Sequence, residues 1–302
     1  SKEKNGMNKL TTVEKLNKKQ IEGFFSEALN IEKTWPNLKK VGENKTICLF
    51  FWEPSTRTKL SFEHAAKALG FNVLDFSPSL SSVQKGESLE DTLNTLISLK
   101  IDGLVMRHPE NKISEQIAKL LPKEVLFINA GDGNHAHPTQ GLLDAFTISK
   151  LKNISDSKVA IIGDVKHSRV IPSLFSGLKK MDCTQIEFFG PKELIPSNFT
   201  PQKNDITENC LEGFDFLYVL RIQNERFLED ENLDLQNYIK NYQVNDKFLE
   251  FTKFDGKIMH PGPVNLDYEI TKSVSNSNNS IILDQVENGL YLRAGILSLL
   301  ID

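Results

Sequence analysis

Residues 46–76 read TICLFFWEPSTRTKLSFEHAAKALGFNVLDF. The apolar run Ile47 to Trp52 predicts a buried strand, and the apolar positions between Phe62 and Leu69 have the spacing of an amphipathic helix. Residues 72–76 predict a second strand. A strand, a helix and a strand in this order form a β-α-β unit, so the stretch predicts a parallel sheet covered by helices.

The same alternation continues on both sides of a polar stretch, Lys152 to Lys158. Further strands are predicted at residues 103–106, 125–128, 159–162, 186–189, 216–220, 257–259 and 281–283. A chain of 302 residues is long enough for two hydrophobic cores. We therefore expect an α/β fold with two similar domains, each a parallel sheet flanked by helices.

Composition and charge exclude several classes of protein. The formal net charge is −4, so no overall basic field exists to hold nucleic acid or an anionic membrane. No apolar stretch is long enough to span a bilayer. The three cysteines form no CxxC pair, which favours a reducing compartment over a disulfide framework. We expect a cytoplasmic protein that binds neither nucleic acid nor membrane.

The segment between the first strand and its helix, EPSTRTK at residues 53–59, is rich in groups that bind anions. A helix N-terminus exposes unpaired N–H groups, to which Ser55, Thr56, Arg57 and Thr58 would add hydroxyls and a positive charge. The alternative is an N-cap with a solvated arginine. Because ligands of open α/β sheets bind at the carboxyl ends of strands, the position favours a phosphate cradle.

Two neighbouring segments carry further basic residues. Arg107 ends a predicted strand, where it could donate two parallel hydrogen bonds to a phosphate or form a strand-terminal salt bridge. Ser81 and Lys85 lie in a loop before the next predicted helix. Read alone, Lys85 is a solvated surface lysine.

The segment GDGNHAHPTQ, residues 131–140, contains the strongest rival chemistry. His135 and His137 could form half of a metal site, which would suit a metal hydrolase. The other four histidines lie in no ligand motif such as HExxH. No GxGxxG fingerprint and no GxxxxGK[ST] loop occurs in the sequence, so nucleotide-dependent chemistry has no support.

The second half of the chain offers two arginines at predicted strand ends, Arg169 and Arg221. Two arginines suit the two carboxylates of a dicarboxylic amino acid, although each could also be structural. The segment HPGPVN, residues 260–265, follows another short strand. Taken alone it predicts a rigid turn.

Six of these segments resemble, in order, the motifs of the carbamoyltransferase family, starting from Ser-Thr-Arg-Thr at residues 55–58. The resemblance implies transfer of a carbamoyl group from carbamoyl phosphate to the amino group of L-aspartate, an early step of de novo pyrimidine biosynthesis. It implies no cofactor and no metal. Ornithine-specific members carry a His-Cys-Leu-Pro turn where this chain has His260 to Pro263, which favours aspartate. A relative that binds without catalysis is a further alternative.

The resemblance also implies roles for individual residues. Thr58, Arg107 and His137 would donate to the developing oxyanion, and Arg57 and Lys85 complete the implied catalytic set. The implied contacts of carbamoyl phosphate are Ser55, Thr56, Arg57, Thr58, Ser81, Lys85, Arg107, His137, Gln140, Gly262 and Pro263. The implied contacts of aspartate are Lys85, Arg169, Arg221 and Gln223.

Domain boundaries and assembly complete the expectation. The resemblance implies a carbamoyl phosphate-binding domain over residues 7–141, an aspartate-binding domain over residues 142–288, and a C-terminal helix, 289–302, that packs back on the first domain. It implies a homotrimer in which Ser81 and Lys85 reach the neighbouring active site. It leaves open whether regulatory chains join the trimer.

Overall fold

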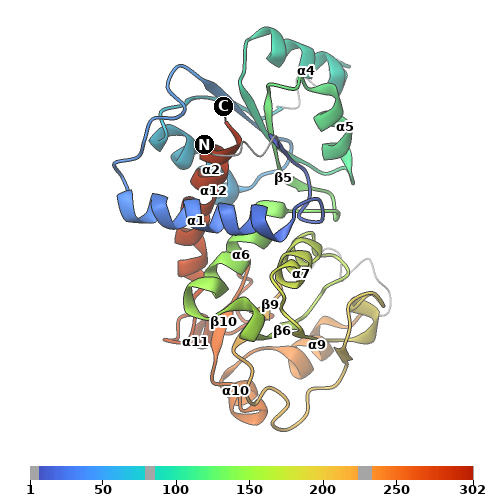
Figure 1. The fold of residues 1–302 in the computed structure, drawn as a ribbon. Coiled ribbons are helices and arrows are strands. Elements are labelled where there is room, and N and C mark those ends of the chain that lie inside the picture. Colours follow the sequence, from blue (N-terminus) through green and yellow to red (C-terminus); the bar gives the residue numbers. More distant parts are fainter. Residues whose placement is uncertain (1–6, 79–85, 224–232, 302) are drawn as a thin grey trace. The chain divides into compact units, whose positions relative to one another are not determined.

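The computed structural model describes residues 7–78, 86–223 and 233–301. Two compact units each contain one five-stranded parallel sheet (Figure 1). The first unit runs to Phe146 and also includes Pro172–Gly177 and Val286–Asp302. The second unit consists of Thr147–Ile171 and Leu178–Gln285. The expected fold class, α/β with a helix-flanked parallel sheet in each of two similar domains, is confirmed.

The sheet of the first unit has the strand order β1-β5-β4-β2-β3, with every pair parallel. Its strands are β1 (Lys9–Leu10), β2 (Thr46–Phe51), β3 (Asn72–Phe76), β4 (Gly103–His108) and β5 (Leu126–Asp132). The strands predicted at 47–52, 72–76, 103–106 and 125–128 are therefore present. β1 was not predicted, because two residues carry no readable period.

Helices of the first unit begin where the sequence supplies caps. Asn17 and Gln20 form a capping box at the start of α1, and Ser88 and Asp91 form another at the start of α4. The helices are α1 (Lys18–Thr34), α2 (Thr56–Ala68), α4 (Leu89–Ser98), α5 (Ile113–Leu120) and α6 (Pro138–Leu151). One core cluster of this unit packs α4 and α5 against the sheet through Leu93, Ile117 and Phe127.

The second unit repeats the plan with the strand order β10-β9-β6-β7-β8, again parallel throughout. Its strands are β6 (Lys158–Ile162), β7 (Gln185–Phe189), β8 (Gln202–Lys203), β9 (Phe216–Val219) and β10 (Lys257–Met259). The remaining helices are α7 (Val170–Lys180), α9 (Leu235–Tyr242), α10 (Asp246–Thr252), α11 (Lys272–Ser275), α12 (Ile282–Leu300), and the short 3-10 turns η1 (Ile154–Asp156) and η2 (Lys192–Leu194).

One predicted strand, at residues 281–283, is wrong. α12 begins at Ile282, and the only strand-like contact nearby is a single bridge between Ser280 and Ile258 among the described residues. Three apolar residues cannot distinguish a strand from the first turn of a helix, because neither period repeats in so short a run. The exposed side chain of Leu283 fits a helix surface rather than a buried strand.

The C-terminal helix α12 joins the first unit from Val286 onward. At Gly295 an added Cβ would lie 3.0 Å from the backbone nitrogen of Ala28, so α12 and α1 approach at backbone distance. None of the helices that the structure describes combines the length and the apolar composition needed to cross a bilayer.

Candidate active site

The N-terminus of α2 lies at the carboxyl end of β2 and carries the predicted phosphate cradle. Ser55 is the N-cap residue, but within the described part of the chain its side chain does not cap the helix. Its Oγ instead accepts a hydrogen bond from Arg107 Nη1 at 2.7 Å. Thr58 is buried, whereas Thr56 and Arg57 are exposed. The first turn thus keeps backbone N–H groups that can donate to an anion.

Arg107 stands beside this helix start because β4 pairs with β2, in a register that places Arg107 next to Phe51. Its Nε donates to Glu53 Oε2 at 3.4 Å, so Ser55 and Glu53 together orient the guanidinium. The salt-bridge alternative is therefore present in the structure, and phosphate binding by Arg107 stays a prediction. The contact of Glu53 with Arg107 was not predicted, although Glu53 belongs to the same segment as Ser55.

His137 and Gln140 lie at the start of α6. The backbone N–H of His137 donates to Ser173 Oγ at 3.1 Å, and Gln140 Nε2 donates to Asp144 Oδ1 at 3.1 Å. Both side chains are buried. An added Cβ at Gly141 would lie 2.7 Å from the backbone nitrogen of Leu174, so α6 packs against the 172–177 segment at backbone distance. This packing fixes the helix turn that carries His137.

A buried arginine on α12, Arg293, was not predicted. Its Nε donates to Thr139 Oγ1 and its Nη1 to Ser61 Oγ, each at 3.2 Å. Burial lowers the pKa of its guanidinium to about 10, which still leaves the group charged at neutral pH. Arg293 therefore connects α6 to α2 and places a buried positive charge between these two helices. The only sequence signal is a charge inside the otherwise apolar run 290–300.

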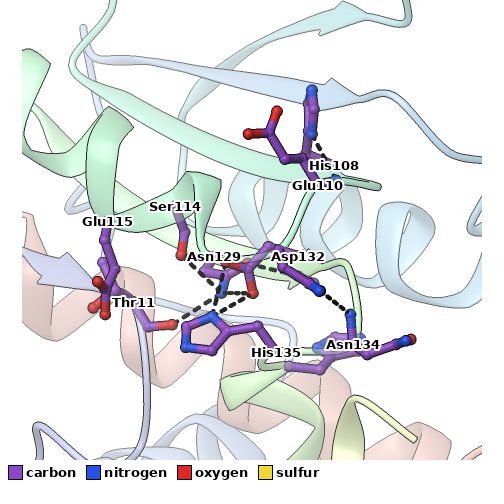
Figure 2. A network of polar contacts seen from close by, with 12 residues as sticks. Thr11, His108, Glu110, Ser114, Glu115, Asn129, Asp132, Asn134 and His135 are labelled. Atoms are coloured by element: carbon purple, nitrogen blue, oxygen red, sulfur yellow. Dashed lines mark hydrogen bonds and ion pairs between the residues drawn. The ribbon is translucent and has the colours of Figure 1, made fainter. Parts of the chain in front are cut away.

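The loop that leads from β5 to α6 is held by a buried polar network (Figure 2). Asp132 accepts from Ser114 Oγ at 2.6 Å, from Asn129 Nδ2 at 3.0 Å and from His135 Nδ1 at 3.0 Å. His135 thus faces a carboxylate. Among the described residues, no group of three His, Cys, Asp or Glu side chains is placed to hold a metal ion.

The second unit presents Arg169 at the start of α7. Asp164 accepts from His167 Nδ1 at 2.8 Å, and Ser168 Oγ accepts from the backbone N–H of Ile171 at 3.2 Å. Arg169 is half-buried and lies within the second of these contacts, directly after Ser168. The loop after β6 is therefore held by one contact before the arginine and by one that spans it.

Arg221 and Gln223 follow β9, and a buried carboxylate shapes this strand end. Glu269 Oε2 accepts from the backbone N–H of Ile222 at 3.4 Å, and its Oε1 accepts from the backbone N–H of Asn265 at 2.8 Å. The Arg221 side chain itself is exposed. Glu269 thus connects the 221–223 strand end to the turn at residues 260–265.

That turn contains Gly262 and Pro263. His260 Nε2 donates to Glu269 Oε1 at 2.8 Å, and His260 Nδ1 accepts from the backbone N–H of Gly262 at the same distance. A carboxylate only accepts hydrogen bonds, so these two contacts fix the histidine tautomer. The sequence predicted a rigid turn here, and the resemblance implied substrate contacts for Gly262 and Pro263, but the part played by Glu269 was not predicted.

The structure brings together some of the predicted residues and leaves others untested. Ser55 and Arg107 are in direct contact, and the Arg221 strand end is linked to the turn that contains Gly262. Ser81 and Lys85 lie outside the described residues.

Comparison with known proteins identifies the family. Residues 8–150 match the profile "Aspartate/ornithine carbamoyltransferase, carbamoyl-P binding domain", and residues 155–300 match "Aspartate/ornithine carbamoyltransferase, Asp/Orn binding domain". The chain belongs to the aspartate/ornithine carbamoyltransferase family. Both profiles together span nearly all of the described residues.

Individual members of the carbamoyltransferase family are similar to this chain over most of their length. The chain is 42% identical to the aspartate carbamoyltransferase catalytic subunit of Christiangramia forsetii over 91% of this chain and 88% of that protein. It is 39% identical to the catalytic subunit of Legionella pneumophila, over 96% and 97%.

A solved structure shows the same fold. The Trypanosoma cruzi aspartate transcarbamoylase, in complex with carbamoyl phosphate and aspartate, superposes with a TM-score of 0.87 at 28% identity. The match covers 98% of this chain and 97% of that one.

Proposed function

We propose that this chain is an aspartate carbamoyltransferase, which transfers the carbamoyl group of carbamoyl phosphate to L-aspartate and yields N-carbamoyl-L-aspartate and phosphate. The observation that carries the proposal is the Arg107–Ser55 contact at the uncapped start of α2, which offers a guanidinium, hydroxyls and helix N–H groups to one anion. The relatives named above support aspartate as the acceptor.

On the donor side, catalysis consists of positioning and charge stabilisation, because the mixed anhydride already contains a good leaving group. The neutral amine of aspartate attacks the carbonyl carbon, and the carbon–nitrogen bond forms as the bond to the phosphate oxygen breaks. Thr58, Arg107 and His137 donate to the oxyanion that develops. Phosphate leaves into the cradle of Ser55, Thr56 and Arg57 and takes the amine proton.

On the acceptor side, Arg169 binds the α-carboxylate of aspartate, while Arg221 and Gln223 hold its side-chain carboxylate. Gln140, Gly262 and Pro263 contact the carbamoyl group. Arg221, which is exposed, and Arg169, which is half-buried, are the arginines among the described residues of this unit, and two guanidinium groups suit a dicarboxylate.

Assembly and cellular role are part of the proposal. A homotrimer would let Ser81 and Lys85 enter the neighbouring active site. The proposed donor domain is residues 7–141 with helix 289–302, and the acceptor domain is residues 142–288. We place the enzyme in the cytoplasm, in pyrimidine biosynthesis. The three free cysteines support a reducing compartment.

The test is a carbamoylation assay that offers L-aspartate and L-ornithine in parallel and follows phosphate release and the carbamoylated product. Product from aspartate alone is the expected result. Product from ornithine would preserve the donor site but overturn the roles of Arg221 and Gln223. If neither acceptor were carbamoylated, the chain would be a binding protein. If a chelator abolished activity and an added metal ion restored it, the metal-hydrolase alternative would return.

A further inference from the structure

Both units contain the pattern Gly-Asp-x-x-His at the carboxyl end of an interior strand. Residues 131–135 read GDGNH at the end of β5, and residues 163–167 read GDVKH after β6. β5 lies between β1 and β4, and β6 lies between β9 and β7. Ligands of open parallel sheets bind at the carboxyl ends of strands, so the pattern occurs twice at the kind of position where such sheets bind substrates.

The two copies have nearly the same geometry. The Asp132 and Asp164 side chains are 0% and 1% exposed, and the His135 and His167 side chains are both 18% exposed. Each histidine Nδ1 donates to both carboxylate oxygens, at 3.0 and 3.1 Å in the first copy and 2.8 and 3.0 Å in the second. We call these pairs the Asp132–His135 clasp and the Asp164–His167 clasp.

A glycine makes each clasp possible. Gly131 has φ 120° and Gly163 has φ 127°, a region that side-chain-bearing residues rarely adopt. This conformation turns the chain sharply as it leaves the strand, and the histidine three residues after the aspartate can then return to its carboxylate.

The Asp132–His135 clasp is shown in Figure 2. It belongs to the turn that precedes His137 in the chain. The backbone N–H of Asp132 donates to the carbonyl oxygen of Ala136 at 3.1 Å, which closes the turn one residue before His137. Ser114 Oγ, at 2.6 Å from the carboxylate, anchors Asp132 from α5. The position of His137 therefore depends on this buried carboxylate and on its donors.

The Asp164–His167 clasp stands in the same relation to Arg169. The backbone N–H of His167 also donates to Asp164 Oδ1, at 3.2 Å. Ser168 then caps α7 by accepting from the N–H groups of Val170 and Ile171 at 3.3 and 3.2 Å. Arg169 thus follows the clasp by two residues, as His137 does in the first unit.

We propose that the two clasps are equivalent positioning elements. His135 positions the loop that carries His137, on the carbamoyl phosphate side, and His167 positions the loop that carries Arg169, on the aspartate side. The inference rests on the proposed function. We assign both histidines as positioning residues, because each acts through the hydrogen bond from its Nδ1 to the aspartate of its own loop. Because each clasp lies within one loop, its loss affects the substrate of that loop first.

The test compares His135→Ala and His167→Ala with His135→Asn and His167→Asn. Asparagine can place an amide N–H near the position of Nδ1 and so keep the hydrogen bond to the aspartate, whereas alanine cannot. His135→Ala is expected to raise the KM for carbamoyl phosphate and lower kcat, each roughly tenfold, with the KM for aspartate changed less than about twofold. His167→Ala is expected to raise the KM for aspartate roughly tenfold. Each Asn variant should recover most of the loss.

Titration calorimetry with inorganic phosphate separates this inference from the proposed function. Phosphate should bind more weakly to His135→Ala and unchanged to His167→Ala. Ser114→Ala provides a milder variant that weakens the same carboxylate network if His135→Ala fails to fold. Equal effects of both alanine variants on both substrates, or Asn variants as impaired as the Ala variants, would overturn the proposal. If the unaltered protein carbamoylated neither amino acid, the proposed function would fail, and phosphate binding would still decide the role of His135.

Discussion

The two units organise their candidate binding groups in different ways. In the first unit the side chain that would bind substrate is itself held, because Arg107 donates to Ser55 and to Glu53. In the second unit Glu269 accepts from the backbone N–H groups of Ile222 and Asn265, whereas Arg221 beside Ile222 is exposed. Arg107 is therefore preorganised before binding, whereas Arg221 becomes ordered during binding.

Among the variants that test this comparison, loss of Arg107 is expected to reduce kcat most. Arg107→Ala should lower kcat roughly 10³-fold, because it removes a preorganised hydrogen-bond donor to the oxyanion and the phosphate. Glu53→Gln should give an intermediate loss, since the guanidinium keeps Ser55 but loses its carboxylate partner. Steady-state kinetics would measure both. A turnover rate of Arg107→Ala near that of the unaltered protein would show that the donor site is not organised around this residue.

Loss of Arg221 should weaken acceptor binding alone. Arg221→Ala is expected to raise the KM for aspartate roughly 10- to 100-fold through the loss of a charge-assisted contact, with little change in phosphate affinity. Lys247→Ala, at another exposed basic position in the same unit, is the matched control and should behave as the unaltered protein. An equal loss of phosphate affinity would mean that the two sites are not separable in this way.

The packing behind His137 can be tested without removing a polar group. Gly141→Ala would place a Cβ 2.7 Å from the backbone of α7, and should lower the free energy of unfolding by about 1–3 kcal/mol. Gly23→Ala on α1 is the control, because nothing lies within 4 Å of its added Cβ, and it should raise stability by about 0.5–1 kcal/mol. Urea denaturation monitored by circular dichroism distinguishes the two. Similar stabilities for both variants would contradict the close approach of α6 and α7.

The smallest expected effect concerns pH. Burial lowers the pKa of His108 below its ordinary value of 6.5, so the unfolded chain takes up a proton before the folded protein does. The free energy of unfolding should therefore fall as pH decreases below 6.5, and His108→Gln should reduce this slope. Denaturant unfolding between about pH 7 and pH 5 tests the change. An unchanged slope would show that His108 does not contribute.

Much of the site could be located from the sequence, because strand ends follow from hydrophobic period. Ser55, Arg107 and Arg221 each lie at the carboxyl end of a predicted strand or directly after it, and parallel strands bring those ends to one edge of a sheet. The family motifs then indicated the chemistry. The roles assigned to these residues stay predictions, and those of Ser81 and Lys85 concern positions outside the described residues.

The contacts that hold the site could not be predicted in this way. Arg293 donates to Thr139 across 154 positions of the chain, and Glu269 accepts from Ile222 across 47. Whether such pairs meet depends on how helices pack and how loops return, which local period does not encode. His135 illustrates the point, since its spacing suited a metal site whereas its ring faces a buried aspartate.

The sequence by itself determined the α/β alternation, the two-sheet plan and the strand-end positions of the binding groups, because periodicity and turn chemistry are local properties. Only the tertiary structure decided which carboxylates are buried, which histidine nitrogen donates, and which arginine is held before substrate arrives. Those features depend on burial and on contacts between residues far apart in the chain, and both exist only once the sheets and helices have packed.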